Sequence, residues 1–166
     1  TDMSYLFDGI NSFNEDISSW DVSNVTDMSY MFNDSGFNQV ISDYWDFSNV
    51  NTMEGMFLYN TSFNQPLNNW DVSNVTNMYG MFQDAYIFNQ PLDNWNVSNV
   101  TEMTNMFYSI ADSSLEADSL FNQDLSSWDV SSVTACHSFC PISIESNNNW
   151  TLPKPNFSNC GNTNCD

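Results

Sequence analysis

The chain has 166 residues, of which 41% are apolar and 16% aromatic, a composition that supports a buried core and excludes a disordered polar chain. Its 21 carboxylates and single basic residue, Lys154, give a formal charge of −20, which disfavours nucleic acid and anionic membranes as partners. No apolar run reaches the roughly 18 residues of a membrane span. Because the first residue is Thr1 rather than Met, we expect a processed product or part of a longer protein.

A fixed period organises the sequence. Tryptophan recurs at Trp20, Trp45, Trp70, Trp95 and Trp128, and a valine follows each of them five residues later. The first three steps are 25 residues long and the last is 33, so one copy carries an insertion, which lies at 109–119. A period of this size predicts a solenoid, in which each coil buries its apolar side only by stacking on its neighbours.

The first predicted element of each copy is a short strand. Residues 1–7 align with 26–32, so the chain opens inside a repeat, and the pattern apolar-x-x-Trp-x-apolar-x-x-Val follows in five copies, the second of which has one extra residue before Trp45. Alternation around Trp20 places Trp and Val on one face of the strand and Asp21 and Ser23 on the other. This arrangement is similar to the strand of a leucine-rich repeat.

The second predicted element is a helix of one to two turns. After each valine the sequence reads Thr-x-Met-x-x-[Met/Leu]-Phe in most copies, and apolar residues three and four apart indicate a helix, with Thr26 and its equivalents as N-caps. A Phe-Asn-Gln turn leads to the next strand, and we expect its Asn to satisfy turn backbone groups. The predicted fold is therefore an α/β solenoid, a right-handed coil of short parallel strands and short helices.

The four cysteines divide the chain into two parts, a repeat solenoid at 1–140 and a Cys-rich cap at 141–166. We expect two disulfides, with Cys136 and Cys140 each joined to either Cys160 or Cys165, which indicates an oxidising, extracellular setting. A zinc site that also uses His137 is the alternative, although the spacing fits no common zinc framework. Trp150 and Phe157 are predicted to close the exposed end of the last coil.

The repeat, Phe-Asn-Gln-x-[Leu/Ile]-x-x-Trp-Asp-Val-Ser-Asn-Val-Thr-x-Met-x-x-Met-Phe, resembles the BspA-like, DUF285-type surface repeat over residues 1 to about 140. The resemblance implies a relative of leucine-rich repeats in surface-exposed or secreted proteins of bacteria and aquatic microbial eukaryotes, used in adhesion and contacts with partner proteins. It implies no catalytic residues. The Cys-rich tail lies outside the pattern and favours a eukaryotic secreted product.

The outward strand position suggests a cation site. Asp21, Asp46, Asp71 and Asp129 are expected to stack on successive coils, where neighbouring carboxylates repel one another. Two interpretations remain open: hydrogen bonds from neighbouring serines offset the repulsion, or a row of Ca²⁺ ions does. No cofactor is required, and with one histidine and one basic side chain we predict that the protein is not an enzyme.

Two further kinds of site follow from the sequence. Potential N-glycosylation acceptors are Asn24, Asn33, Asn60, Asn74, Asn96, Asn99, Asn149 and Asn156, and we favour those expected in loops, at positions 33, 60, 149 and 156. The start of the chain should expose the apolar end of a coil through Met3, Leu6 and Phe7, which form a candidate self-assembly edge.

Together these expectations predict a secreted or cell-surface structural and adhesive protein. The most specific version of this hypothesis is that the protein is the subunit of a head-to-tail fibre. Its partners would be further copies or another surface protein. The alternative is a secreted recognition module that binds a protein, a glycan or Ca²⁺ through its acidic strand face. An ice- or mineral-binding face is a third class, and an ice-binding face is disfavoured because Thr is predicted to cap helices rather than to line strands.

Overall fold

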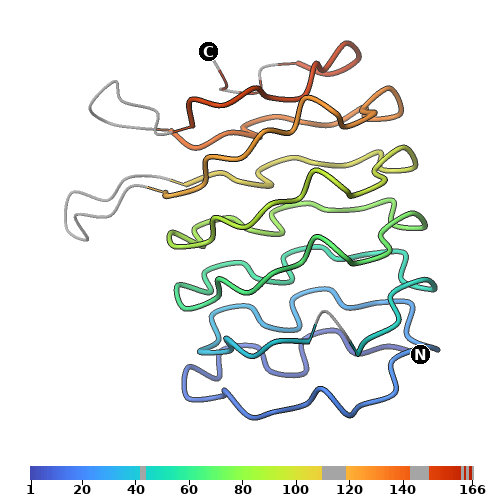
Figure 1. Ribbon diagram of the computed structural model, residues 1–166, viewed down its shortest axis with the longest axis vertical. Coiled ribbons are helices and arrows are strands. Elements are labelled where there is room, and N and C mark those ends of the chain that lie inside the picture. Colours follow the sequence, from blue (N-terminus) through green and yellow to red (C-terminus); the bar gives the residue numbers. More distant parts are fainter. Residues whose placement is uncertain (42–43, 110–118, 143–149, 162, 164, 166) are drawn as a thin grey trace.

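The computed structural model describes residues 1–41, 44–109, 119–142, 150–161, 163 and 165. Over these residues the chain winds into five coils that lie one above another, from the blue start of the chain to its red end (Figure 1). We number them coil 1 (1–25), coil 2 (26–50), coil 3 (51–75), coil 4 (76–100) and coil 5 (101–133), and call residues 134–165 the closing segment. This stack places equivalent side chains of successive repeats in rows.

The predicted strands and helices are wrong. The described part of the chain contains no helix and, in place of strands, isolated parallel bridges that join each coil to the next. They pair Asp2 with Asp27, Asp27 with Thr52, Thr52 with Asn77, Asn77 with Glu102 and Glu102 with Ala135. A helix able to span a membrane is likewise not found in that part. The α/β architecture is thus replaced by coils of turns and irregular segments, joined by isolated bridges.

A row of backbone hydrogen bonds holds neighbouring coils together, and it runs through the segment that was expected to be helical. Between coils 1 and 2 the N–H groups of Met3, Tyr5, Phe7 and Gly9 donate to the carbonyls of Asp27, Ser29, Met31 and Asn33, at 2.9–3.0 Å. The same four bonds join coils 2 and 3, coils 3 and 4, and coils 4 and 5. All of these donors point towards the later coil, and all of the acceptors belong to it.

Left-handed backbone residues explain why this segment is not helical. Tyr30 has φ of 57°, and the equivalent residues Gly55 and Gly80 each have φ of 56°. One such residue ends the right-handed run that a helix needs. The spacing of three and four residues instead comes from consecutive turns, as where the N–H of Met31 donates to the Met28 carbonyl at 3.3 Å. Both patterns bury the same residues, so the sequence spacing could not separate them.

The interior is built from rows of aromatic and sulfur-containing side chains. Phenylalanines stack from coil to coil, with ring centroids 5.6 Å apart for Phe32 and Phe57 and 5.7 Å for Phe57 and Phe82. Four of the repeat tryptophans, the repeat valines and the methionines of coils 2 to 5 are buried, whereas Trp20 in coil 1 is 37% exposed. The prediction of which side chains face inward is therefore confirmed for these residues and not for Trp20, and the backbone conformation that achieves it differs.

The closing segment covers the last coil and is fixed by two disulfides, Cys136–Cys160 and Cys140–Cys165. Trp150 is buried against Phe107, Phe121 and Phe139, and its indole Nε1 donates to the Gln123 carbonyl at 2.8 Å. Trp150 does not continue the tryptophan row, because Trp128 donates to Leu92, whose equivalent in coil 5 is Leu125 rather than Gln123. The closing segment continues the backbone row instead, since it accepts the N–H groups of Met103, Asn105 and Phe107 through its carbonyls at Ala135, His137 and Phe139.

Candidate functional site

The predicted acidic row lies on the outside of the coils. Asp21, Asp46, Asp71 and Asp129 are exposed, and each accepts a hydrogen bond from the backbone N–H of the serine two residues later. In coil 1 the Ser23 hydroxyl also donates to Asp21 at 2.6 Å. Hydrogen bonds from the serine hydroxyl and then the N–H lower the pKa of Asp21, Asp46 and Asp129. The serines therefore stabilise the ionised carboxylates.

The row brings carboxylates near one another without gathering them into a cluster. The negative charge of Asp46 partly offsets the lowering of the Asp21 pKa, so the two carboxylates interact across neighbouring coils. In the part of the chain that the structure describes, no three His, Cys, Asp or Glu side chains are grouped so that they could hold a metal ion. The sequence left two ways to offset the repulsion, hydrogen bonds from serine or a row of Ca²⁺ ions, and the contacts described here are hydrogen bonds from serine.

A row of Asn and Thr side chains runs beside the acidic row. Asn74 and Asn99 are exposed and donate their side-chain amides to the Ser48 and Ser73 carbonyls of the preceding coil, at 2.7 and 2.8 Å. The threonines are not helix caps, because Thr26 and its equivalents are exposed and bond to the coil before them. Helix-capping threonines therefore give no reason to disfavour an ice-binding face.

The sequon asparagines differ in accessibility. Asn24, Asn96 and Asn156 are exposed, like the two just described, whereas Asn33 is half-buried and donates to the Asp8 carboxylate at 2.7 Å. The prediction of a glycan acceptor at Asn60 is wrong, because this side chain is fully buried and donates to the Phe37 carbonyl at 3.1 Å. Asn149 lies outside the described residues.

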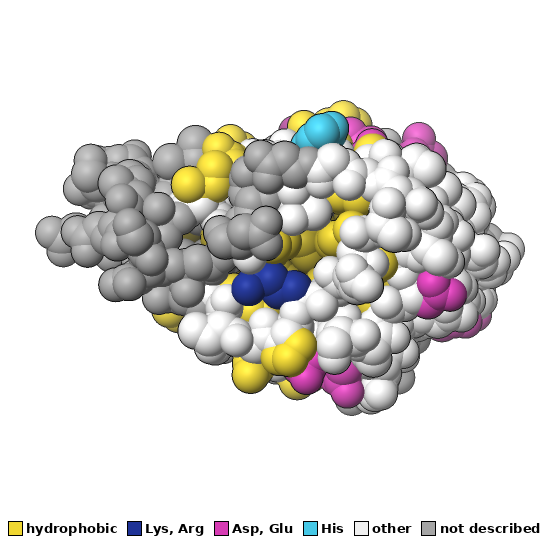
Figure 2. Space-filling model, turned by 90° about the horizontal axis from the view of Figure 1, so that it is seen from above, with side chains coloured by type: hydrophobic (Ala, Val, Ile, Leu, Met, Phe, Trp, Pro, Cys, Tyr) yellow, Lys and Arg dark blue, Asp and Glu magenta, His cyan; other side chains and the backbone are white. Residues whose placement is uncertain are grey.

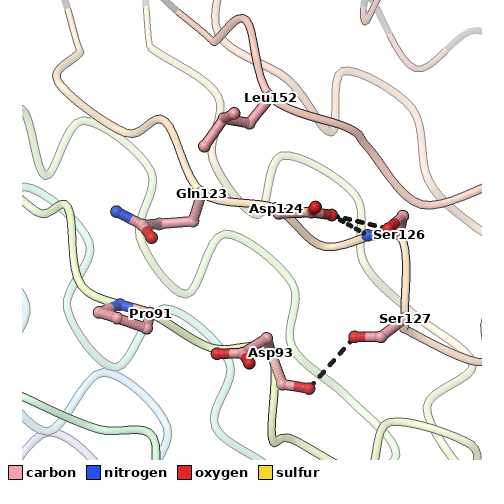
Figure 3. A pocket seen from close by; sticks show the side chains of 7 residues that line it. All are labelled: Pro91, Asp93, Gln123, Asp124, Ser126, Ser127 and Leu152. Carbon is pink, nitrogen blue, oxygen red and sulfur yellow. Dashed lines mark hydrogen bonds between the residues drawn. The ribbon is translucent and has the colours of Figure 1, made fainter.

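A shallow groove of about 430 Å³ crosses the stack between coils 4 and 5. Pro91 and Asp93 line it from coil 4, Asp124 and Ser127 from coil 5, and Leu152 from the closing segment (Figure 3). Ser126 bonds to the Asp124 carboxylate at 2.7 Å, and the Ser127 hydroxyl donates to the Asp93 carbonyl at 3.2 Å. The groove offers carboxylate and hydroxyl oxygens, which suit a cation or the hydroxyls of a sugar.

Sequence reasoning did not find this groove. The sequence feature that could have indicated it is a difference between the repeats, since Asp124 occupies the position that Pro66 and Pro91 hold in coils 3 and 4. A carboxylate in place of a proline at a repeat boundary adds a charge where the neighbouring coils have none. The predicted absence of enzymatic activity stays a prediction.

The predicted self-assembly edge lies on the face of coil 1 that points away from coil 2. Met3 and Phe7 are half-buried against the core, and Leu6 is 45% exposed. The opposite end of the stack, seen in Figure 2, is covered by the closing segment, with apolar side chains near its centre around the basic side chain. There Lys154 donates to the Trp150 carbonyl at 3.0 Å. A head-to-tail contact would therefore set the closing segment against coil 1.

The cysteines do not offer a metal site. All four are joined in the two disulfides, so no thiolate remains to bind zinc beside the exposed His137. The prediction that Cys136 and Cys140 each pair with a cysteine of the tail is confirmed, and the pairing itself, which the sequence left open, is now assigned.

The stacked coils and their shared side-chain rows define a repeat protein. Residues 1–119 and 111–151 match the family described as "Mycoplasma protein of unknown function, DUF285", and the chain therefore belongs to the DUF285 family. Neither a curated protein nor a solved structure matches the chain. The family description assigns no activity, so function has to be argued from the surface of the coils.

Proposed function

We propose that the protein is an extracellular structural or adhesive surface protein. The observation that carries this proposal is the combination of a disulfide-fixed closing segment with polar rows that repeat from coil to coil. Disulfides persist in oxidising compartments, which supports an extracellular location. The polar rows give one broad, uniform face, which suits repeated weak contacts better than the recognition of a single small ligand.

The side chains of these rows are held in place rather than free. Asn99 uses one amide hydrogen on the Ser73 carbonyl, and Thr101 Oγ1 lies 3.2 Å from the Thr76 carbonyl. Side chains that are already ordered lose little rotamer entropy when a partner binds, so each contact of a repeated surface costs less. The acidic surface also keeps copies of the protein apart in solution.

Two measurements on the source cells test the proposal. Antibodies raised against the purified protein should stain intact cells, and brief proteolysis of intact cells should remove the signal. Staining that appears only after permeabilisation would refute the extracellular location. Fab fragments of the same antibodies should reduce the attachment of the cells to their substratum, and attachment that stays unchanged under saturating Fab would refute the adhesive role.

A recognition role is the second candidate, and the groove between coils 4 and 5 favours it. Asp93 accepts a hydrogen bond from Asn68 at 3.0 Å, and Asp124 accepts from Ser126, so both carboxylates are positioned by neighbours. The ligand would be a protein, a glycan or Ca²⁺. Ca²⁺ is the simplest probe, because carboxylate oxygens are its usual ligands.

The recognition role is tested by melting the protein in EDTA, in millimolar Ca²⁺ and in millimolar Mg²⁺. Binding predicts a Tm that rises with Ca²⁺ in the native protein and rises less in Asp93→Asn. Asp34→Asn is the matched control, because this exposed acid lies outside the groove. A glycan array with the same variants covers sugars. Equal responses of both variants would place any binding outside the groove.

A further inference from the structure

The groove between coils 4 and 5 is lined by residues that depart from the repeat. At the position of Asp93, coil 3 has Asn68, and at the position of Asp124, coils 3 and 4 have proline. Leu152 comes from the closing segment, outside the repeat. These lining side chains belong to three successive levels of the stack, which Figure 3 shows one above another. The repeat period therefore does not explain why they meet in one groove.

Hydrogen bonds between the levels fix the walls of the groove. The Leu152 N–H donates to Asn122 Oδ1 at 3.0 Å, and the carbonyl of the next residue accepts from the Leu125 N–H at 2.9 Å. Across the groove, the Ser127 hydroxyl donates to the Asp93 carbonyl at 3.2 Å. These bonds tie the closing segment to coil 5 and coil 5 to coil 4. A site formed in advance costs less to organise when a ligand binds.

The side-chain donors of the groove are already used. Gln123 Nε2 donates to the Asn89 carbonyl at 3.0 Å and to Asn89 Oδ1 at 2.8 Å. The Ser126 hydroxyl donates to Asp124 Oδ1 at 2.7 Å, and the Ser127 hydroxyl is engaged as just described. The lining side chains therefore offer a ligand only hydrogen-bond acceptors.

One oxygen of each groove carboxylate remains for a ligand. Asp93 uses Oδ1 to accept from Asn68 at 3.0 Å. Asp124 uses Oδ1 to accept from Ser126, at 2.7 Å from the hydroxyl and 3.0 Å from the N–H. The two Oδ2 atoms accept no hydrogen bond from the described part of the chain. The Ser126 hydroxyl and then its N–H lower the pKa of Asp124, so this carboxyl is ionised at neutral pH. A matching ligand donates hydrogen bonds and carries positive charge.

An amine fits this groove better than a metal ion or a neutral sugar. Ca²⁺ takes about six to eight oxygen ligands, and the described residues include no group of three acidic, His or Cys side chains that could hold an ion. A sugar hydroxyl both donates and accepts, and its oxygen finds no free side-chain donor here. A metal ion also gains nothing from exposed Pro91 and from Leu152, which is 42% exposed. An ammonium on an aliphatic stem uses the carboxylates and the apolar walls together.

We propose that the groove binds an alkylammonium group, with its nitrogen at the Oδ2 atoms of Asp93 and Asp124 and its aliphatic stem against the apolar walls. The inference rests on the recognition role proposed for this groove and names the class of ligand. Lys154 does not fill the site, because it lies outside the lining residues and is engaged on a carbonyl of the closing segment. It is the one basic side chain of the sequence, so the ammonium comes from outside these 166 residues.

An NMR chemical-shift titration of the whole chain tests the class of ligand. The main probe is Nα-acetyl-lysine N-methylamide. Its Nε-acetylated form keeps the stem without the charge, and methylammonium keeps the charge without the stem. We expect a Kd on the order of 1 mM for the lysine probe, and a Kd about fivefold or more higher after either change or in high salt. Glucosamine and putrescine distinguish an amino sugar and a free polyamine from a protein lysine as the source of the amine.

Variants of the groove locate the binding. Asp93→Asn and Asp124→Asn should each weaken binding of the lysine probe about twofold to fivefold, the effect of one exposed ion pair. Asp34→Asn is the matched control, because it removes the same charge from an exposed acid outside the groove and should leave the affinity in place. Leu152→Ser should abolish the preference for the lysine probe over methylammonium. The spectra also report whether each variant is folded.

The outcomes separate this inference from the recognition role. An affinity for the lysine probe that neither aspartate variant changes, or that equals the affinity for the Nε-acetylated form, would overturn the inference. If Ca²⁺ or N-acetylglucosamine shifts the resonances of the groove and no amine does, the inference fails and the recognition role stands. If none of these probes shifts them, both fail.

Discussion

Replacement of Gly55 by Ala tests whether left-handed turns hold the stack together. Gly55 has φ of 56°, and a Cβ built on it would overlap the ring of Tyr30. The left-handed conformation costs an alanine about 1–2 kcal/mol. Displacement of the ring would also break the 2.6 Å bond from the Tyr30 hydroxyl to Glu54. A bond to a charged group contributes about 1.5–3 kcal/mol, and we take the lower end because this site is partly exposed. The expected loss is therefore about 3 kcal/mol.

Gly80→Ala is the matched control, because Gly80 has the same φ of 56° but its nearest neighbour would be Gln83 Oε1 at 3.3 Å. Its expected loss is about 1–2 kcal/mol, the conformational cost without the clash. Urea unfolding followed by circular dichroism measures both variants, and Gly55→Ala in a Tyr30→Ala background should cost no more than Gly80→Ala. Equal losses for the two single variants would refute the argument.

Three other measurements test the contacts described above. Reduction of the disulfides, which close loops of 24 and 25 residues, should lower the free energy of unfolding by about 3 kcal/mol each, and an unchanged urea midpoint in reductant would contradict this. Trp95→Phe removes one of the two hydrogen bonds that the Leu67 carbonyl accepts, the other coming from the Trp70 N–H. It should cost about 0.5–1.5 kcal/mol more than Trp70→Phe, whose indole has no partner within the described residues, when both are compared by urea unfolding. The pKa values of Asp21 and Asp46 are lower in the folded protein than in the unfolded chain, where the pKa of Asp is near 4. The two carboxylates therefore stabilise the fold when the pH is above about 4, and this contribution is lost as the pH falls through their folded pKa values. The urea midpoint should thus decrease as the pH is lowered below about 4, and it should decrease less steeply when Ser23 and Ser48 are both replaced by alanine.

The sequence predicted which side chains are buried better than it predicted the backbone that buries them. The period placed Trp45 and Val50 in the interior and Asp46 outside, as observed. Burial depends only on the direction of each side chain, and turns, strands and helices can all reproduce one inward pattern. The glycines at Gly55 and Gly80 were the available sign of left-handed turns, but Tyr30 at the same position carries no such sign.

The candidate sites divide in the same way. The acidic row was predictable because it follows the repeat, and so was the bonding of Cys136 and Cys140 to the tail, whereas the choice between the two tail cysteines was not. The burial of Asn60 was not predictable. The equivalent residues are Ser35 and Ala85, so this core-facing position accepts different small side chains and has no fixed residue type in the repeat. Features that occur in one copy, such as Asp124, needed the coils to be aligned in space before their neighbours could be named.

The regular register of the coils has an evolutionary consequence. Because the hydrogen bonds between neighbouring coils join residues about one period apart, and the two disulfides span 24 and 25 residues, any whole period is interchangeable with the next. Unequal recombination that adds or deletes 25 residues would lengthen or shorten the rod while both termini keep their contacts. A single coil can also carry extra residues, since the step from Trp95 to Trp128 is 33 residues and Trp128 still donates to the Leu92 carbonyl. Variants that gain or lose repeats should therefore differ by whole coils.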